Sequence, residues 1–218
     1  MADIQTSCNR CGTCCMSGGP ALHGPDKALV QNGSIPLSSL ITIRKGELVH
    51  HPPAAQVLSA RQELIKIRGV GKQWTCMYYD ESSGCTIYAN RPEACRALKC
   101  WDTQAIEALI EHDTLSRIDL VESDDPLYHA IMEHESLFPC PDLESILKHG
   151  AVSGPQELEE MVNRELAYRT RMVGAQRLTL HQELFYFGRP LFQLLISVGG
   201  EVRQVGNTLH VGWPQRQG

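Results

Sequence analysis

The spacing of its cysteines constrains this chain more than any other feature. The 218 residues contain nine cysteines, and eight of them lie among the first hundred residues. These eight form two groups, C-x2-C-x2-C-C and C-x8-C-x9-C-x4-C, whose members are Cys8, Cys11, Cys14, Cys15, Cys76, Cys85, Cys95 and Cys100. No basic start and no apolar segment precedes the first group, so we expect no secretory signal and a cytoplasmic location. Because thiols in a reducing compartment rarely persist as disulfides, the pattern favours metal binding.

The first group has the spacing of an iron–sulfur ligand set. Three cysteines at x2 intervals can occupy three corners of a cubane, because each intervening pair lets the chain turn around a sulfide face. Cys8, Cys11 and Cys14 fit this use, and a distant cysteine would then supply the fourth ligand. A structural zinc site more often takes two separate C-x2-C pairs, and the first group supplies only one. The spacing therefore favours an iron–sulfur cluster over zinc.

Two other uses of the cysteines can be compared with metal binding. Buried thiols can act as small hydrophobic side chains, but the residues between the first cysteines (Asn9, Arg10, Gly12, Thr13) are too polar for that role. Cys140, which lies between two prolines outside both groups, is the opposite case and is interpreted as a structural thiol. Cationic residues beside the clusters would stabilise negative thiolates, and each has the alternative interpretation of a solvated surface charge; they are Arg10, Arg91, Arg96 and Lys99.

Charge differs between the two halves of the chain. Residues 1–100 carry 11 Lys and Arg against 7 Asp and Glu, a net charge of +4, whereas residues 101–218 carry 9 against 18, a net charge of −9. A centre with four thiolates has a net charge of about −2, so two such centres would neutralise the first half. Nucleic acid is therefore a disfavoured partner, because its binding requires a surface that stays basic. The acidic half is a candidate surface for binding a protein partner.

The organisation of the chain follows the same division. We expect a cysteine-cluster metal-binding domain over residues 1–102 and a mainly helical acidic region over residues 103–218, which together make an α+β fold. A hydrophobic fraction of 42% is typical of a folded chain, and no stretch approaches the roughly 18 apolar residues of a membrane span. Membrane insertion is therefore not expected.

Local patterns predict the individual elements. Residues 1–20 lack periodicity and are expected to form a loop that orders around a ligand. Alternating or aromatic residues predict short strands over 41–44, 64–68 and 74–79, and residues 50–53 are expected to be a linker or turn. A helix is predicted over 25–33 and is closed by Asn32-Gly33. A second is predicted over 90–98, with Asn90 as the capping residue and Glu93 three positions later. Further helices are predicted over 103–113, 126–135, 141–149, 155–173 and 179–198. Residues 201–211 are expected to form a β-hairpin.

Several further motifs are weaker candidates for sites. Residues 69–72 (Gly-Val-Gly-Lys) lack the remaining residues of a phosphate loop and are interpreted as a turn. His129 and His134 are spaced by five residues, which does not place them on one helix face, so both are expected at the surface. His50-His51 could supply a non-cysteine ligand, but a polar loop is preferred. The apolar stripe at 184–187 and 191–192 is expected in the core. No motif of a hydrolase or a nicotinamide enzyme is present.

The cysteine pattern resembles the YkgJ-type cysteine-cluster family, a zinc- or iron-chelating domain. The resemblance rests on Cys8-x2-Cys11-Gly12-x-Cys14-Cys15 and on Cys85-x-Ile87-Tyr88-x2-Arg91-Pro92-x2-Cys95-Arg96, closed by Cys100, and covers residues 8–102. It implies that the eight matched cysteines are metal ligands and that the helix start at Arg91-Pro92 is structural. Some longer relatives are flagellin lysine methylases, but nothing after Trp101 transfers that activity to this chain.

Three hypotheses follow. The first is a metal-binding protein with one or two thiolate centres, with an iron–sulfur cluster preferred to zinc as the cofactor. The second is a cluster-dependent redox or methyl-transfer enzyme, which needs an open coordination position or a pocket beside the cluster. The third is a zinc-stabilised adaptor whose acidic helical half binds a protein partner. All three require the two cysteine groups to converge in the folded chain.

Overall fold

The fold is α+β, as the sequence predicts. The computed structural model describes residues 5–51, 54–149 and 155–214. Its α-helices are α1 (Thr13–Met16), α2 (Lys27–Gln31), α3 (Glu93–Ala97), α4 (Gln104–Glu107), α5 (Arg117–Leu120), α6 (Pro126–Leu137), α7 (Leu143–His149), α8 (Pro155–Gln176), α9 (Leu180–Phe187) and α10 (Leu191–Ser197). Short 3-10 helices are η1 (Gly24–Asp26), η2 (Leu37–Ser39) and η4 (Tyr88–Asn90).

The strands pair in two-stranded antiparallel sheets rather than in one large sheet. The pairs are β1 (Leu40–Ile43) with β4 (Leu64–Ile67), β2 (Leu48–His51) with β3 (Gln56–Ser59), β5 (Gly69–Val70) with β6 (Thr75–Cys76), β7 (Tyr79–Asp80) with β8 (Gly84–Cys85), and β9 (Glu201–Val205) with β10 (Thr208–Gly212). Sheets this narrow are marginal by themselves, so they depend on the helices and loops that cover them.

The β1–β4 pair connects the cysteine-rich part of the chain to the C-terminal helices. Every residue of β1 is buried, and α9 packs against this strand. The Thr42 hydroxyl on β1 donates a hydrogen bond of 2.5 Å to the carbonyl of Phe185 on α9. Phe185 and Phe187 are completely buried, which confirms the predicted core role of this apolar stripe. One hydrophobic cluster therefore includes residues from both halves of the chain.

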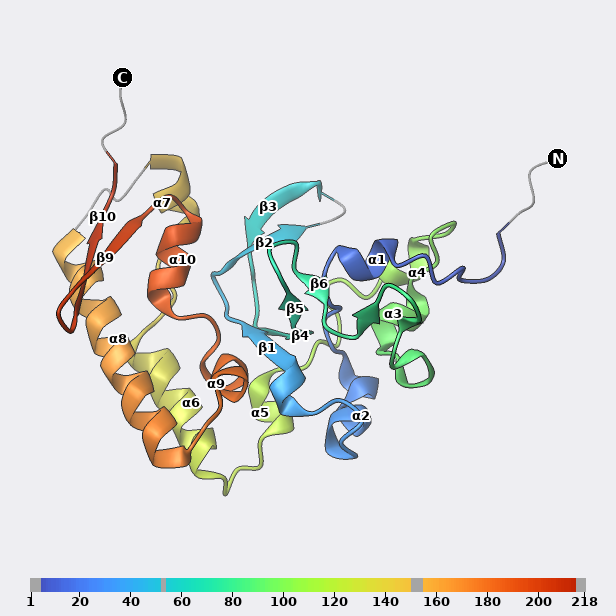
Figure 1. Cartoon of the computed structure of the whole chain (residues 1–218), viewed down its shortest axis with the longest axis horizontal. Helices are drawn as coiled ribbons and strands as arrows, with labels where there is room; N and C mark the ends of the chain where they lie inside the picture. Colours follow the sequence, from blue (N-terminus) through green and yellow to red (C-terminus); the bar gives the residue numbers. More distant parts are fainter. Residues whose placement is uncertain (1–4, 52–53, 150–154, 215–218) are drawn as a thin grey trace.

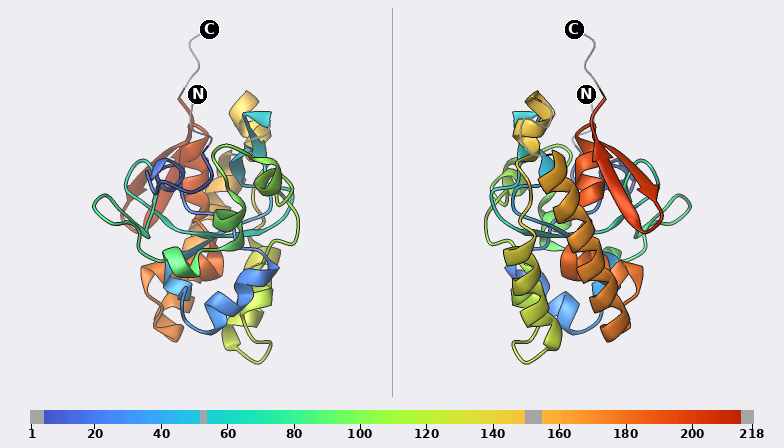
Figure 2. Two further views of the ribbon diagram at one scale, coloured as in Figure 1. Left: turned by 90° about the vertical axis from the view of Figure 1, so that its right-hand side faces the viewer. Right: turned by 90° about the vertical axis from the view of Figure 1, so that its left-hand side faces the viewer.

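The cysteine-bearing segments and the C-terminal elements occupy opposite ends of the molecule. In Figure 1, α1, α3 and α4 lie at one end, the β1–β4 pair lies between, and α8 and the β9–β10 hairpin lie at the other end. The two end views in Figure 2 show α8 and the hairpin on one side and α1 on the other. The division into domains at residue 102 stays a prediction.

Several predicted elements match the structure closely. The strands expected at 41–44 and 64–68 are β1 and β4, and the hairpin expected at 201–211 is β9–β10. The helices expected at 126–135, 141–149 and 155–173 are α6, α7 and α8. Gly33 takes the left-handed φ of 77° that closes the short helix α2. These elements are set by local patterns, which explains the agreement.

Three predicted elements are interrupted. Residues 179–198 form two helices, because Gly188 has a φ of 68° and Pro190 cannot donate a backbone hydrogen bond. Residues 103–113 form only the short helix α4, and the backbone turns left-handed at Glu111 and Asp113, where the Asp113 carbonyl accepts a hydrogen bond from the Gly24 amide. Residues 74–79 divide between β6 and β7, whose partner strands are different.

The predictions for residues 1–20, 50–51 and His134 also need correction. The first segment includes the single helical turn α1. His50 and His51 belong to β2, where they pair with Val57 and Gln56, rather than to a turn; residues 52–53 lie outside the described part. His129 is exposed as predicted, but His134 is completely buried against aromatic rings of Phe138, Tyr168 and Phe187. The spacing of two histidines on a helix does not reveal which face another helix covers.

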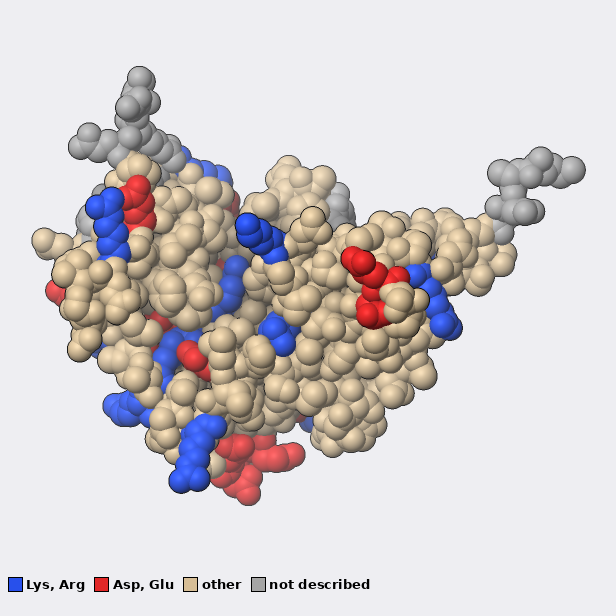
Figure 3. Space-filling model, in the orientation of Figure 1, with Lys and Arg blue, Asp and Glu red and all other residues tan. Residues whose placement is uncertain are grey.

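Two further observations concern the surface of the described residues. Among the described residues, no helix combines the length and apolar character needed to span a bilayer. On the face drawn in Figure 3, acidic and basic side chains lie in small separate groups. That face therefore presents no continuous charged patch.

Candidate metal centre

Four separate segments bring cysteines to the same place. Helix α1 carries Cys14 and Cys15, strand β6 carries Cys76, strand β8 ends at Cys85, and helix α3 carries Cys95. Helix α1 packs directly against β6, which brings the first cysteine group onto the second. The structure thus satisfies the requirement that the two groups converge.

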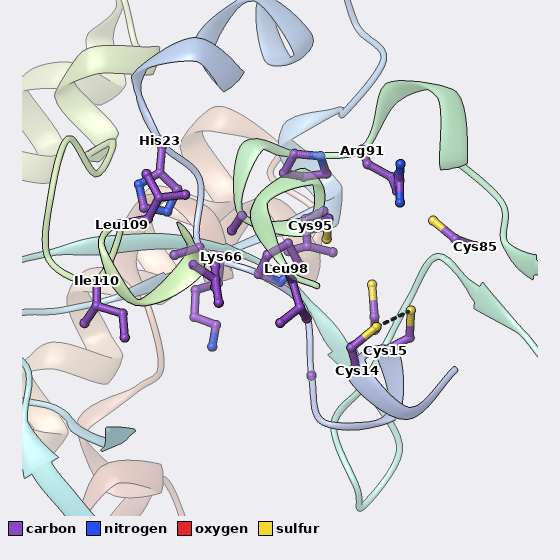
Figure 4. Close-up of a pocket in the computed structure, with 18 of the residues that line it drawn as sticks. Cys14, Cys15, His23, Lys66, Cys85, Arg91, Cys95, Leu98, Leu109 and Ile110 are labelled. Atoms are coloured by element: carbon purple, nitrogen blue, oxygen red, sulfur yellow. Dashed lines mark hydrogen bonds between the residues drawn. The ribbon is translucent and has the colours of Figure 1, made fainter. Parts of the chain in front are cut away.

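The five thiols on these segments lie within electrostatic range of one another. The Sγ atoms of Cys14 and Cys15 are 4.0 Å apart, twice the length of a disulfide bond, and both cysteines are free. Burial, together with the neighbouring thiols of Cys14, Cys76 and Cys85, raises the pKa of Cys15 to about 12. Burial also raises the pKa of Cys95 to about 12, with added contributions from the other four thiols. Figure 4 shows Cys14, Cys15, Cys85 and Cys95 gathered around one space.

The other three cysteines of the motif lie at the rim of the same site. Cys8, Cys11 and Cys100 are exposed, and all three line the cavity that the five thiols face. A hydrogen-bond contact of 3.3 Å with the Thr13 hydroxyl lowers the pKa of Cys11. Cys140 does not line the cavity and instead lies near Gly46, where burial raises its pKa to about 12. Its position agrees with the interpretation of a structural thiol.

A glycine sets the start of the helix that presents Cys14 and Cys15. Gly12 has a φ of 81°, which places it in the left-handed region just before α1, and its carbonyl accepts a hydrogen bond of 2.8 Å from the Met16 amide. A Cβ atom at this position would overlap the phenol ring of Tyr79. The motif therefore needs glycine at position 12 for two reasons, backbone conformation and space.

A buried carboxylate positions the helix that carries Cys95. The sequence predicts that Asn90 caps this helix, but Arg91 is extended before Pro92 and the helix begins at Glu93. The cap comes instead from Asp26, whose Oδ1 accepts a hydrogen bond of 2.8 Å from the Glu93 amide. Asp26 is completely buried, and its Oδ2 accepts a second bond of 2.9 Å from the His23 amide. Sequence reasoning missed this role because the two partners are 67 residues apart.

Two arginines beside the cysteines have no acidic partner in the described part of the chain. The guanidinium carbon atoms of Arg10 and Arg91 lie 4.0 and 3.6 Å from the ring centre of Tyr88. Arg91 also donates a hydrogen bond of 3.0 Å to the Tyr88 carbonyl, but neither arginine forms an ion pair with a described carboxylate. Arg96 differs, since it pairs with Glu93 at 2.8 Å. Uncompensated cations of this kind suit a neighbouring centre that is negatively charged.

The cysteines line one end of a cavity of about 550 Å³. Apolar side chains that include Leu98, Leu109 and Ile110 form much of its wall, and Lys66 also reaches it. His50 and His51, the histidines considered above as non-cysteine ligands, contribute to the same wall. The space is larger than a single metal ion requires, so a small molecule can be accommodated beside the thiols.

The donor chemistry of this site fits a thiolate-bound metal. Sulfur donors suit zinc and iron–sulfur clusters, and the converging thiols have no disulfide partner. Across residues 5–51, 54–149 and 155–214, no three or more His, Cys, Asp or Glu side chains already surround a point as ligands of one ion. Binding therefore requires the side chains to adjust around the metal, which is common where metal binding and folding are coupled.

Comparison with known proteins supports the same chemistry. Residues 7–114 match the family model named CxxCxxCC, which is described as a putative zinc- or iron-chelating domain. The match extends the predicted resemblance from residue 102 to residue 114, through helix α4 and the wall of the cavity. No curated protein and no solved structure is significantly similar to the chain. The cysteine-bearing part of the chain thus matches the CxxCxxCC family.

Proposed function

We propose that this protein binds one or two metal centres through its clustered cysteines and that the preferred cofactor is an iron–sulfur cluster. The observation that carries the proposal is the convergence of five thiols from four separate segments on one cavity. In this proposal Cys14, Cys15, Cys76, Cys85 and Cys95 provide the inner ligands. The exposed cysteines at the rim, Cys8, Cys11 and Cys100, complete the ligand sets.

The electrostatics of the site support a bound cation. In the absence of a metal, burial and mutual repulsion hold the thiols of Cys15 and Cys95 in their protonated form. A metal ion reverses this preference, because it stabilises the thiolate directly. The resulting centre carries a net negative charge, which Arg10 and Arg91 would compensate.

The number and spacing of the cysteines support iron–sulfur over zinc. Eight thiols around one cavity exceed the four that a structural zinc ion uses. The C-x2-C-x2-C spacing of Cys8, Cys11 and Cys14 is suited to three corners of a cluster, with a cysteine of the second group as the fourth ligand.

Metal and sulfide analysis of protein purified without oxygen tests the proposal. We expect iron together with acid-labile sulfide, and the broad visible absorption of iron–thiolate charge transfer. Zinc without sulfide would contradict the iron–sulfur preference while retaining metal binding. A folded, colourless protein that binds neither iron nor zinc after reconstitution would contradict metal binding itself.

A matched pair of variants tests the ligand assignment. Cys85→Ser removes a thiol from the cluster, whereas Cys140→Ser removes one outside the cavity. We expect the first variant to lose most of its metal and the second to retain a wild-type content. Circular dichroism of both variants shows whether a loss of metal reflects unfolding before metal addition. Equal metal content in both variants would contradict the assignment of Cys85.

The cavity favours a second function, a cluster-dependent redox or methyl-transfer enzyme. Such an enzyme needs room for a substrate beside the cluster, and a cavity of about 550 Å³ provides it. A reversible one-electron change in the electron paramagnetic resonance spectrum, altered by a small molecule bound in the cavity, would support this function. A spectrum insensitive to every added molecule would favour a structural centre.

A further inference from the structure

Lys66 has an unusual environment on the wall of the cavity. It lies on β4, in which Ile65 and Ile67 are buried in the hydrophobic core. Because side chains alternate along a strand, Lys66 points to the opposite face, and its side chain reaches the cavity. Within the described part of the chain, no hydrogen bond or ion pair involves its ammonium group.

The other charged groups on the cavity wall make contacts that Lys66 lacks. Arg61 forms an ion pair of 3.4 Å with Glu111, and Glu107 accepts a hydrogen bond of 2.6 Å from the Thr103 hydroxyl. Arg10 and Arg91 stack on Tyr88, as described above. Arg10 and Arg91 also lack a described carboxylate partner, but they stack on Tyr88 beside the cysteines, whereas Lys66 has neither an ion pair nor a ring contact among the described residues.

Lys66 is also separated from three of the thiols. In Figure 4 it lies away from Cys14, Cys15 and Cys85, with Leu98 between, and on the side of Leu109 and Ile110. These three apolar residues line the same cavity. The result is one positive charge beside an apolar wall, at the end of the cavity away from Cys14, Cys15 and Cys85.

We propose that this end of the cavity binds a small organic monoanion. Its carboxylate pairs with Nζ of Lys66, and its apolar body packs against Leu98, Leu109 and Ile110. A single ammonium suits a single negative charge, whereas a phosphate dianion requires several donors. A compact apolar body suits a wall formed largely by aliphatic side chains.

The energetics favour such a ligand. A half-buried ammonium without a partner is costly, because burial removes its hydration without replacement. Burial lowers the pKa of Lys66, and the positive charge of Arg189 lowers it further. A bound carboxylate supplies the missing counter-charge. Its binding free energy is therefore more favourable here than at an exposed lysine.

Calorimetric titration of the full-length protein with sodium hexanoate tests this inference. Hexanamide serves as the neutral analogue of similar shape. We expect hexanoate to bind at least tenfold more tightly than hexanamide. Lys66→Met should weaken hexanoate binding at least tenfold, and Lys66→Arg should retain most of it. Lys72→Met, at an exposed lysine outside the cavity, should leave the affinity unchanged.

Several outcomes would overturn the inference. Absence of hexanoate binding, equal affinity for hexanamide, or equal affinity in the Lys66→Met variant each contradicts a charge-directed site. Loss of metal from that variant without any hexanoate binding by the wild type would show that Lys66 serves the metal centre. The comparison of hexanoate with hexanamide on the wild type remains decisive if the variant does not fold.

The inference is independent of the proposed metal function. Metal content is measured on the same preparations used for calorimetry. Hexanoate binding that depends on Lys66, in protein that binds neither iron nor zinc after reconstitution, would support the anion site and contradict only the metal proposal. Metal binding without hexanoate binding would support the metal proposal and contradict the anion site.

Discussion

The carboxylate of Asp26 accepts the backbone amide of Glu93 at 2.8 Å and thereby caps a helix 67 residues further along the chain. This contact connects the segment after the first cysteine group to the helix that carries Cys95. A helix of five residues has little stability of its own, so its position depends on such contacts. Asp26 is therefore a positioning residue for the cluster.

Replacement of Asp26 should weaken both folding and metal binding. Asp26→Ala leaves the amides of His23 and Glu93 without their charged acceptor, and we expect a loss of about 3 kcal/mol in the free energy of unfolding. Asp26→Asn should lose less, because it keeps one acceptor oxygen. Urea unfolding and metal analysis measure the two effects. Asp119→Ala, at the exposed cap of α5, is the control, and an equal loss there would contradict a special role for Asp26.

Gly12 and Gly33 should respond differently to alanine. Both have left-handed φ angles, 81° and 77°, but a Cβ at Gly33 meets nothing within 4 Å, whereas one at Gly12 overlaps Tyr79. Gly33→Ala should therefore lower the free energy of unfolding by only about 1 kcal/mol, because alanine is strained in the left-handed backbone conformation. Gly12→Ala should displace α1 and reduce metal content severalfold. Similar metal content in the two variants would show that the contact with Tyr79 is unimportant.

The buried His134 predicts that stability falls in mild acid. Burial lowers the pKa of His134 to about 4 from an ordinary value of 6.5. The charges of Arg169 and Arg44 act in the same direction, and the hydrogen bond of 3.1 Å with Glu165 acts against them. Its Nδ1 is buried and has no hydrogen-bond partner among the described residues, which agrees with a neutral ring. Between pH 6.5 and 4, the unfolded chain therefore binds a proton that the folded chain does not.

The size and sign of this effect can be measured directly. Neutral His134 contributes about 3 kcal/mol to the free energy of unfolding. This contribution is complete above pH 6.5 and is lost as the pH falls toward 4. Urea unfolding at several pH values should show this slope in the wild type and a weaker one in His134→Leu. His129→Leu, an exposed change on the same helix, should leave the slope intact. An unchanged slope in His134→Leu would assign the effect to another group.

Glu135 links two buried arginines and should be important for stability. Its carboxylate accepts bonds from Arg44 at 2.7 Å and from Arg117 at 2.6 Å, and both guanidiniums are buried. Glu135→Ala removes one acceptor from each guanidinium, so we expect the free energy of unfolding to fall by about 3 kcal/mol. Ser136→Ala, a change at the exposed neighbouring position, should cost little. Thermal and urea unfolding compare the two, and equal losses would mean that the bridge contributes nothing measurable.

The elements predicted correctly are those that depend on local signals. Alternation of apolar residues identified β1 and β4, and helical periodicity identified α6 and α8. The family resemblance was equally local, because it rests on cysteine spacing that a comparison of sequences detects. The errors at 90–98, 103–113 and 179–198 arose where proline, left-handed residues or distant hydrogen bonds interrupt a helix.

The sequence by itself determined that this chain concentrates thiols in two groups and that its cysteine-bearing part matches the CxxCxxCC family. Only the tertiary structure decided which thiols face one another, that Asp26 caps the helix of Cys95, and that Lys66 reaches the cavity without a partner among the described residues. Spacing along the chain fixes what neighbouring residues can do. Contacts between residues tens of positions apart depend instead on how the small sheets and helices pack, because burial, charge and hydrogen bonding act through space.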